Sequence, residues 1–323
     1  NIIKENKEDG MYCYDNSGLT IMDNSIVANG EKGLFIVHSS CSIANNTIKK
    51  NRDSGIQCQD SSDVTVTDNS IAANSGPGLA FFSFFSGSLT GNTLMDNAGG
   101  GILLIDVSNV KISENYFKGN KEDGIYMRVC NGIEITRNEI TDTILSNRYG
   151  EGILAKETIV LIKDNIIKSS ATDGLEVWGV NSIVETIDNT ITDNLVNGIY
   201  CESGVTITGC CNTVTNNGTN FSGCTASLAE CPCPGGGAGD TLSITPSSVV
   251  LTRLDTQAQL TAIVEGKNGA TLNVTDKTAW SSSNTGIAIV DNKGLITAIG
   301  NGEAEICAGY NTLRTCVKVT TNT

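Results

Sequence analysis

Short segments in which hydrophobic and polar residues alternate recur along the first two thirds of the chain. Each segment starts at a Gly that is followed by Met, Leu or Ile, and residues 55–59 (Gly-Ile-Gln-Cys-Gln) are typical. Alternation with a period of two predicts a strand. A second strand precedes each member of a series of asparagines, for example at residues 64–66 and 133–135. Gly, Asn, Asp and Ser interrupt every candidate helical stripe. The pattern predicts two or three short strands in each repeat.

Ten asparagines set the period of these repeats, at steps of 23, 22, 23, 23, 23, 23, 27, 24 and 23 residues. They are Asn1, Asn24, Asn46, Asn69, Asn92, Asn115, Asn138, Asn165, Asn189 and Asn212. In eight of the ten repeats a second Asn follows five residues later. A fixed period of about 20–50 residues indicates stacked units that bury their apolar faces against their neighbours. We expect the stacked asparagines to form ladders of amide hydrogen bonds.

A column of glycines completes the repeat at Gly10, Gly33, Gly55, Gly78, Gly101, Gly124, Gly152, Gly174 and Gly198. We expect Gly and Asn to occupy the corners between strands because both tolerate a positive φ. These features predict an all-β protein that begins with a parallel β-helix of nine to ten coils. The step from Gly124 to Gly152 is 28 residues long and holds an extra loop around residues 146–149. Solenoids often place binding residues on such loops.

The string Asn-Thr/Ser-Ile, four or more residues, then Gly-Ile resembles the right-handed parallel β-helix repeats of the pectate-lyase-like superfamily. The resemblance covers residues 1–220. It implies the fold, and it leaves the function open, because the superfamily includes polysaccharide lyases, glycoside hydrolases, epimerases, phage tailspikes and adhesins.

The repeats end after residue 217, and a different composition follows. Residues 221–240 hold a Cys-rich cap and a Gly/Pro linker, and residues 241–323 hold short alternating segments that predict a β-sandwich. Residues 244–246 (Ile-Thr-Pro), 280–283 (Trp-Ser-Ser-Ser) and 292–298 (Asn-Lys-Gly-Leu-Ile-Thr-Ala) resemble a bacterial Ig-like domain of group 2. The resemblance implies a spacer or surface-attachment module. We expect Trp280 to lie in its core.

The charge of the chain disfavours several partners. Its formal net charge is −14, and it has only 21 Lys and Arg residues with no basic run. Nucleic acid and anionic membranes are therefore poor partners. No apolar run is long enough for a transmembrane helix. Because the chain starts inside a coil, we expect an upstream segment to precede Asn1.

Twelve cysteines indicate an oxidising, extracellular or cell-surface compartment. Cys307 and Cys316 flank a predicted hairpin and are expected to form a disulfide. Six more crowd the end of the repeats, in an unknown pairing that we expect to staple a cap over the open end: Cys201, Cys210, Cys211, Cys224, Cys231 and Cys233. A metal site is the alternative for this cluster. Cys13, Cys41 and Cys58 fall at inward positions, where Cys acts as a small hydrophobe.

The positions two and four residues after each column Gly should point outward, yet twelve of these eighteen residues are apolar or aromatic. A strip this long and apolar exceeds what a soluble monomer normally exposes. We expect another subunit, the Ig-like domain, a loop or a polysaccharide to cover it. The candidate binding or assembly residues are Tyr12, Tyr14, Phe35, Phe82, Ile105, Tyr126, Trp178 and Tyr200.

One further column of equivalent positions contains candidate catalytic residues. Five residues after the column Gly stand Asp15, His38 and Asp60, and His38 is the single histidine of the chain. Stacking would place His38 between two carboxylates, which is a weak acid–base candidate for polysaccharide chemistry. The alternative is structural, since Asp commonly caps turns.

Acidic residues also precede several column glycines, at residues 8–9, 122–123, 151 and 173. They could hold calcium, although we expect solvated turns because the column is interrupted in other coils. No other cofactor or metal is expected.

We therefore favour a non-enzymatic, secreted or cell-surface protein that works by contact, as an adhesin or as the subunit of an oligomer or filament. The first alternative is a carbohydrate-active enzyme, meaning a polysaccharide lyase, hydrolase or epimerase. The second is a non-catalytic glycan-binding module that uses the same aromatic residues.

Overall fold

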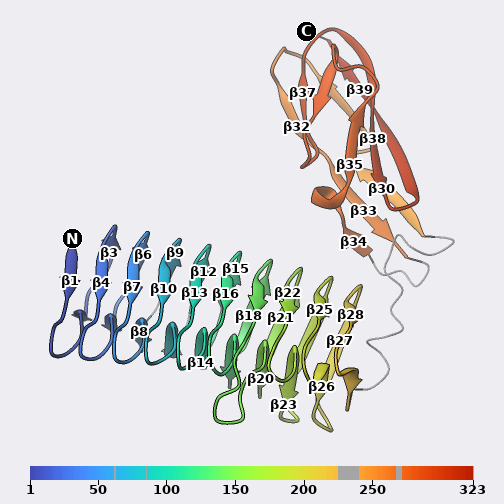
Figure 1. Cartoon of the computed structure of the whole chain (residues 1–323). Coiled ribbons are helices and arrows are strands. Elements are labelled where there is room, and N and C mark those ends of the chain that lie inside the picture. The colour runs from blue at the N-terminus through green and yellow to red at the C-terminus, as the bar shows by residue number, and fades with distance from the viewer. Residues whose placement is uncertain (62, 85, 225–239, 267–270, 323) are drawn as a thin grey trace. The chain divides into compact units, whose positions relative to one another are not determined.

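The computed structural model describes residues 1–322 except residues 62, 85, 225–239 and 267–270; the side chain of Phe84 is also outside the description. The chain forms two compact units, Asn1–Glu230 and Cys231–Thr323. The first is a stack of coils and the second is a small β domain (Figure 1).

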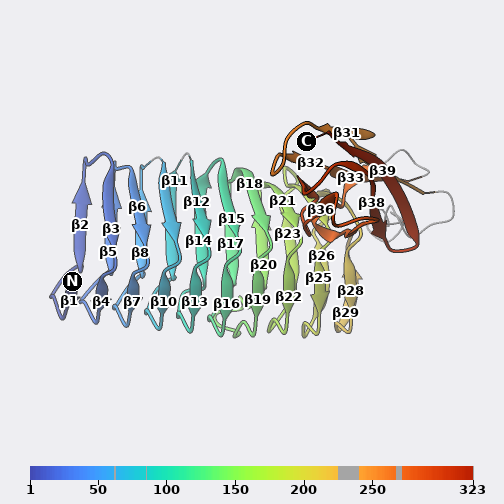
Figure 2. The same ribbon diagram turned by 90° about the horizontal axis from the view of Figure 1, so that it is seen from above.

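Three parallel sheets run the length of the first unit, and Figure 2 shows their strands side by side along the stack. Sheet A contains β1 (Ile2–Lys4), β4 (Ser25–Val27), β7 (Thr47–Lys49), β10 (Ser70–Ala72), β13 (Thr93–Met95), β16 (Tyr116–Lys118), β19 (Glu139–Thr141), β22 (Ile166–Lys168), β25 (Thr190–Thr192) and β28 (Thr213–Thr215). Sheet B contains β2 (Met11–Tyr14), β5 (Leu34–Val37), β8 (Ile56–Gln59), β11 (Leu79–Phe84), β14 (Ile102–Val107), β17 (Ile125–Arg128), β20 (Ile153–Lys156), β23 (Leu175–Trp178), β26 (Asn197–Cys201) and β29 (Thr219–Ser222). Sheet C contains β3 (Leu19–Met22), β6 (Cys41–Ala44), β9 (Val64–Thr67), β12 (Gly87–Thr90), β15 (Val110–Ser113), β18 (Asn131–Thr136), β21 (Ile159–Lys163), β24 (Ile183–Ile187) and β27 (Thr206–Cys210). The prediction of a parallel β-helix is confirmed.

Inward side chains stack in register from coil to coil and form one elongated core. In sheet A, Ile48 pairs with Ile26 on one side and with Ile71 on the other, and all three are fully buried. Each sheet repeats this arrangement, because strands separated by one period present equivalent residues. Burial of this continuous apolar column is the main stabilising term of the solenoid.

The asparagines form two ladders, as predicted. In the first, the side chain of Asn69 donates to Oδ1 of Asn92 at 3.0 Å, and the backbone N–H of Asn69 donates to the same oxygen at 2.9 Å. The Asn92 side chain in turn donates to Asn115 and to the carbonyl of Val66. Each buried amide is thus satisfied by neighbouring coils, which removes the cost of burying a polar group.

The reason that we gave for the corner residues holds at some corners and fails at others. Gly91 at 68° and Asn45 at 56° each precede a laddered Asn and have a positive φ, as does Asp68 at 54°. The laddered asparagines themselves and the column glycines do not have a positive φ. The column Gly is required for space instead. A Cβ on Gly33 would lie 2.5 Å from the carbonyl oxygen of Gly55 and 2.6 Å from Cγ2 of Ile48.

Cysteines occupy two kinds of position in the solenoid. Cys13, Cys41 and Cys58 are buried in the core, as expected. Cys201 and Cys224 form a disulfide at the last coils, with an S–S distance of 2.08 Å. Cys231 and Cys233 lie outside the described residues, and the pairing of the remaining cap cysteines stays a prediction.

The second unit is a β domain with its own core. Its elements are β30 (Thr241–Thr245), β31 (Ser248–Leu251), β32 (Gln257–Gln259), β33 (Thr261–Glu265), β34 (Thr271–Asn273), the short helix η2 (Thr275–Lys277), β35 (Ala279–Ser282), β36 (Ala288–Val290), β37 (Leu295–Ala298), β38 (Gly302–Tyr310) and β39 (Leu313–Thr321). Trp280 packs against this core and donates its indole N–H to the carbonyl of Thr275. The predicted disulfide between Cys307 and Cys316 is present and joins β38 to β39.

Over the described ranges, no helix has the length and apolar character needed to cross a membrane.

Candidate functional site

The outer face of sheet B carries the apolar strip that the sequence predicts, but this strip is not continuously exposed. Tyr12 is 59% exposed and Tyr14 is 50% exposed, whereas Ala80 and Leu154 are buried at equivalent outward positions. Trp178 is 36% exposed. The other members of the strip are half-buried, namely Phe35, Phe82, Ile105, Tyr126 and Tyr200. Part of the strip is therefore covered within the chain.

The extra loop between β19 and β20 projects from this side of the solenoid (Figure 1). Ser146 and Tyr149 close it with two backbone hydrogen bonds of 2.9 Å, as in a tight hairpin. Between them, Asn147 has a φ of 52° and Arg148 a φ of 81°. Such a turn favours Gly at its second position, so Arg148 sits there against the backbone preference. Strain of this kind is often kept where a side chain has a function.

Tyr149 at the base of the loop contacts Tyr126 on β17. The two ring centroids lie 6.3 Å apart and the ring planes are at 87°. This edge-to-face contact is favourable for aromatic pairs and holds the loop against sheet B.

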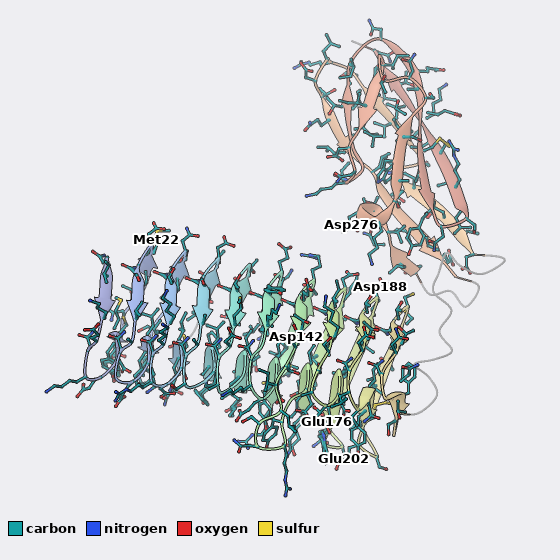
Figure 3. The ribbon with its side chains drawn as sticks, in the orientation of Figure 1. Met22, Asp142, Glu176, Asp188, Glu202 and Asp276 are labelled. Carbon is teal, nitrogen blue, oxygen red and sulfur yellow. A yellow bond between two sulfur atoms is a disulfide. The ribbon has the colours of Figure 1, made fainter. Side chains whose placement is uncertain are left out.

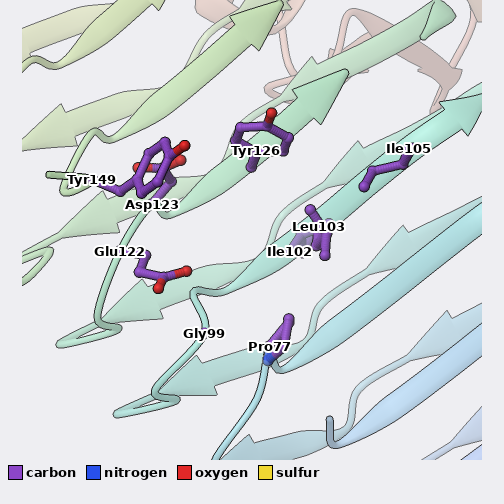
Figure 4. A pocket seen from close by; sticks show the side chains of 9 residues that line it. All are labelled: Pro77, Gly99, Ile102, Leu103, Ile105, Glu122, Asp123, Tyr126 and Tyr149. Carbon is purple, nitrogen blue, oxygen red and sulfur yellow. The ribbon is translucent and has the colours of Figure 1, made fainter. Parts of the chain in front are cut away.

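Two hollows lie on either side of this tyrosine pair. The first has a volume of about 390 Å³ and is mainly apolar; Leu103, Ile105 and Asp123 are among its lining residues (Figure 4). The second has a volume of about 310 Å³, and its lining is the mixed set Tyr126, Asn147, Arg148, Tyr149, Glu151, Leu154, Lys156, Glu176 and Trp178. Because both hollows share Tyr126 and Tyr149, they form one groove across the coils from β14 to β23. We call it the sheet B groove.

Three carboxyl groups beside the sheet B groove are buried, which corrects our expectation of solvated turns at these positions. Asp123 is 3% exposed, Glu151 is 4% exposed and Asp173 is 6% exposed. Asp123 accepts the backbone N–H groups of Gly150 and Glu151 at 3.1 and 3.2 Å. These two residues therefore tie the inserted loop to the preceding coil.

Glu151 and Glu176 both line the second hollow. Burial raises the pKa of Glu176 to about 8, and the nearby charges of Glu151 and Asp173 act in the same direction. The pKa of Glu151 is lowered, because hydrogen bonds, first from Asp123 and then from the backbone N–H of Gly150, outweigh its burial. At neutral pH, Glu176 therefore holds a proton next to an ionised Glu151. Figure 3 shows Glu176 and Glu202 on the side of the solenoid that carries the inserted loop.

Asp123 and Asp173 have raised pKa values as well. In both cases burial is the largest cause, and the charge of Glu151 adds to it. Asp173 accepts the backbone N–H and the side-chain amide of Asn197, each at 2.8 Å. These hydrogen bonds resemble the Asn ladders, so Asp123 and Asp173 also help to hold neighbouring coils together.

Two cations line the second hollow, Arg148 and Lys156. Neither takes part in any of the ion pairs formed among the described residues. Arg128 lies beside Lys156 on the adjacent strand. Unpaired cations at one place on a chain of net charge −14 would attract an anionic group.

The predicted column of Asp15, His38 and Asp60 is brought together at a solvent-exposed corner. Nδ1 of His38 lies 3.4 Å from Oδ1 of Asp15, and Nε2 lies 3.8 Å from Oδ2 of Asp60. All three residues have a positive φ, near 50°. Asp and His tolerate this conformation better than most residues, so the corner itself explains their presence.

The aromatic residues of the first coils gather beside this corner. Tyr12 lies 5.4 Å from Phe35, and Tyr14 lies 5.4 Å from His38, measured between ring centroids. A hollow of about 420 Å³ at this corner is lined by His38 and Asp60, and the aromatic residues are not among its lining.

The sequence named Tyr126 and Trp178 but not Glu151, Glu176 and Lys156 as members of one site. The sequence does not show that the inserted loop lies next to the outward positions of β20 and β23, and these elements together line the second hollow. In the part of the chain that the structure describes, no group of three or more His, Cys, Asp and Glu side chains is arranged to hold a metal ion. The expectation that no cofactor is bound, with calcium as the alternative, stays a prediction.

Comparison with known proteins identifies the family. Residues 1–102 and 84–231 match the right handed beta helix region, and the chain belongs to this family. Residues 240–315 match the bacterial Ig-like domain (group 2). A search of curated proteins gave no significant match.

Several solved structures are similar to part of this chain. One is the A-module of the mannuronan C-5 epimerase AlgE6 from Azotobacter vinelandii, with 20% identity, a TM-score of 0.55 and coverage of 61% of this chain and 58% of that chain. Another is an alginate lyase from Paenibacillus, with 12% identity, a TM-score of 0.48 and coverage of 68% of this chain and 90% of that chain. A third is the pectate lyase Pel9A, with 11% identity, a TM-score of 0.44 and coverage of 66% of each chain. The chain thus spans little more than half of the AlgE6 module, and the likeness concerns the fold.

Proposed function

We propose that this protein binds a polysaccharide in the sheet B groove. The observation that carries the proposal is the pair of adjoining hollows shared by Tyr126 and Tyr149, with Trp178 at the far wall. Aromatic rings offer flat apolar surfaces for the faces of sugar rings, and a few polar groups then fix orientation. A groove that crosses several coils also suits an extended polymer better than a small molecule.

The polar lining supports a glycan as the ligand. Arg148 and Lys156 supply donors, Glu151 supplies an acceptor, and Asn147 supplies both. Trp178 continues the aromatic surface to Tyr200 on the next coil, with 6.0 Å between ring centroids. Hydroxyl groups of a sugar could therefore be bound while its ring faces rest on apolar surface. The structural neighbours named above include proteins that act on alginate and pectate, which is consistent with this proposal without establishing it.

The test is a glycan array followed by calorimetry with the best ligand. Trp178→Ala should weaken binding by about tenfold or more, which corresponds to the loss of one stacking surface. Met22→Ala, at an exposed site on sheet C, is the control and should bind normally. If the wild-type protein binds no glycan, or if Trp178→Ala binds as well as the wild type, the proposal fails.

We also propose an extracellular or cell-surface location, for which the two disulfides are the support, since such bonds persist in oxidising compartments.

A second candidate function is self-association into an oligomer or filament, with adhesion as its use. The observation in its favour is the exposed aromatic surface of Tyr12, Tyr14 and Phe35, which is separate from the sheet B groove. Apolar surface that is exposed in this way commonly marks an interface. It could serve together with glycan binding, as in a surface assembly that holds a polysaccharide.

A further inference from the structure

A separate hollow of about 260 Å³ lies on the outer face of sheet C and shares no lining residue with the sheet B groove. Its lining includes Gly132, Glu134, Ile159, Leu161, Ile183 and Glu185. We call it the sheet C hollow. These residues belong to the neighbouring strands β18, β21 and β24, and Figure 2 shows β18 and β21 side by side.

A β-bulge in β18 opens this hollow. The pairing of β18 with β21 shifts register at Gly132, which is the extra residue of β18. Gly132 has a φ of 67°, and a Cβ at this position would lie 2.8 Å from Oδ1 of Asn109. The bulge therefore requires Gly, and no side chain covers this part of the sheet.

The hollow interrupts the polar outer face of sheet C. Leu161 is the one apolar residue in a row of equivalent outward positions on the nine strands of this sheet. The row consists of Thr20, Ser42, Thr65, Ser88, Lys111, Glu134, Leu161, Glu185 and Thr208. Ile159 and Ile183 pair with each other beside Leu161, and both are exposed. Adjoining exposed apolar residues on an otherwise polar face indicate a contact site.

Two carboxylates flank Leu161. Glu134 and Glu185 stand on the strands on either side of it, so their backbones are about 9.6 Å apart at two strand spacings. Glu185 takes part in none of the ion pairs found among the described residues. Glu134 lies 4.0 Å from Nζ of Lys111, and both side chains are half exposed. An exposed pair at this distance contributes little, so both carboxylates are available to a further cation.

The charges decide which occupant suits the sheet C hollow. A second copy of this chain is disfavoured, because a two-fold contact would oppose like carboxylates on chains of net charge −14. A Lys or Arg side chain is favoured, since it can lay its aliphatic stem on Leu161 and place its charged end between Glu134 and Glu185. Ile159 precedes Leu161 by two residues, about 6.6 Å along the strand. Residues i and i+2 of an extended peptide have the same spacing.

We propose that the sheet C hollow docks an extended segment of a partner protein in which an aliphatic residue stands two positions from a Lys or Arg. The aliphatic side chain packs on Ile159 and Ile183. The basic side chain lies over Leu161 and pairs with Glu134 and Glu185. This contact is independent of glycan binding, and it gives the solenoid a second binding face.

The test uses the full chain and the fluorescence anisotropy of a labelled peptide with the repeat Leu-Ser-Lys-Ser. When extended, this peptide presents Leu and Lys alternately on one face. Peptides with the repeats Leu-Ser-Glu-Ser and Ser-Ser-Lys-Ser remove the positive charge and the aliphatic residue, respectively. We expect the first peptide to bind more tightly than both of the others, and more weakly as the salt concentration rises.

Substitutions in the hollow should weaken binding of the Leu-Ser-Lys-Ser peptide. Glu185→Gln should weaken it by about twofold to fivefold, the range for an exposed ion pair. Leu161→Ser should weaken it by about threefold or more through lost apolar contact. Glu8→Gln removes an exposed carboxylate from the first coil, and Met22→Ser removes an exposed apolar side chain from sheet C. Both are controls and should bind as the wild type does.

Thermal unfolding shows whether Leu161→Ser is folded, and Ile183→Ser, at an exposed position, is a second apolar variant. Weaker binding in Glu185→Gln and in either apolar variant, with both controls unchanged, supports the inference. A wild-type protein that binds no Leu-Ser-Lys-Ser peptide overturns it, as does equal binding of the Leu-Ser-Glu-Ser peptide. A wild-type dimer that becomes monomeric in Ile183→Ser would assign the hollow to a second copy and would also overturn it.

Discussion

Tyr149, in the inserted loop, and Tyr126, on β17, meet edge to face with their ring centroids 6.3 Å apart. This contact joins a loop to the coil that precedes it and divides the sheet B groove into its two hollows. The position of the loop, and with it the shape of the groove, therefore depends on one aromatic pair.

Replacing Tyr149 by Ala should free the loop without unfolding the solenoid. Loss of an edge-to-face pair costs about 0.5–1.5 kcal/mol beyond buried area, which is about twofold to thirteenfold in local opening. Hydrogen exchange should speed up by this factor at the backbone amides of Ser146 and Tyr149, each of which donates to the carbonyl oxygen of the other residue. The amides of β17 and β20 serve as the internal control. Unchanged exchange in the loop would show that its backbone bonds hold it without the ring.

The Asn ladder should be the most sensitive polar element of the solenoid. Asn92→Ala leaves two donors of Asn69 without their acceptor and opens a buried gap. We expect a loss of about 2–4 kcal/mol, from about 1–3 kcal/mol for each unsatisfied buried group. The shift of the urea midpoint measures it, with Thr65→Ala at an outward position of β9 as the control. Equal shifts in the two variants would mean that the ladder is not a major source of stability.

The stability of the protein should depend on pH through Glu176. Its pKa is about 8 in the folded protein, against 4.5 for an ordinary Glu, and burial is the main cause. The folded state therefore binds more protons between these two values. This contribution is fully present below pH 4.5 and is lost as the pH rises toward 8. Thermal midpoints of the wild type should fall more steeply over this interval than those of Glu176→Gln. Parallel curves for the two proteins would contradict the raised pKa.

The core thiols should not react while the protein is folded. Burial raises the pKa of Cys41 to about 12 and that of Cys130 to about 11, so neither thiol forms a thiolate at neutral pH. Iodoacetamide should label these residues only after denaturation, as mass spectrometry of the labelled peptides would show. The disulfides of Cys201–Cys224 and Cys307–Cys316 should survive in the same non-reducing samples. Rapid labelling of Cys41 in the folded protein would mean that the first coils open readily.

Self-association should depend on the aromatic surface of the first coils. Tyr12→Asp with Tyr14→Asp places charge on side chains that are 59% and 50% exposed, so the fold should be kept. If this surface is an interface, the change should lower the sedimentation coefficient at micromolar concentration to that of the monomer. Thr20→Asp, at an exposed position of β3, is the control. A wild-type protein that is monomeric at all concentrations would remove this candidate function.

The repeat made the solenoid predictable, because a fixed period determines both the strands and the stacking of equivalent residues. The regular spacing of the asparagines predicted their ladders for the same reason. The column glycines were explained incorrectly, since the sequence does not distinguish a Gly that needs φ > 0, such as Gly91, from one that needs space. At Gly33 only the distances to the next coil decide between the two reasons.

The candidate site was only partly predictable. Tyr126 and Trp178 stood out because an outward aromatic residue breaks the polar pattern of a surface. Glu151 and Glu176 did not, since acidic residues at a turn or at an outward strand position are usually solvated. Their environment depends on where the inserted loop lies beside sheet B, and such tertiary contacts leave no periodic trace in the sequence. The structure therefore favours the sheet B groove as the candidate site over the exposed corner at His38.

The Asn ladders make the solenoid adjustable in length. In the first ladder each Asn donates to an equivalent Asn one coil further on. The second ladder is interrupted at Thr143 and Ser170, and at its end Asn217 donates to Asn220 within its own coil. Removing or adding one whole period would return every donor of the first ladder to a matching acceptor. The distance between the exposed aromatic surface of the first coils and the sheet B groove could then change in steps of one strand spacing, about 4.8 Å. A lineage could thus tune the reach of this protein by duplication or loss of a coil while the groove keeps its shape.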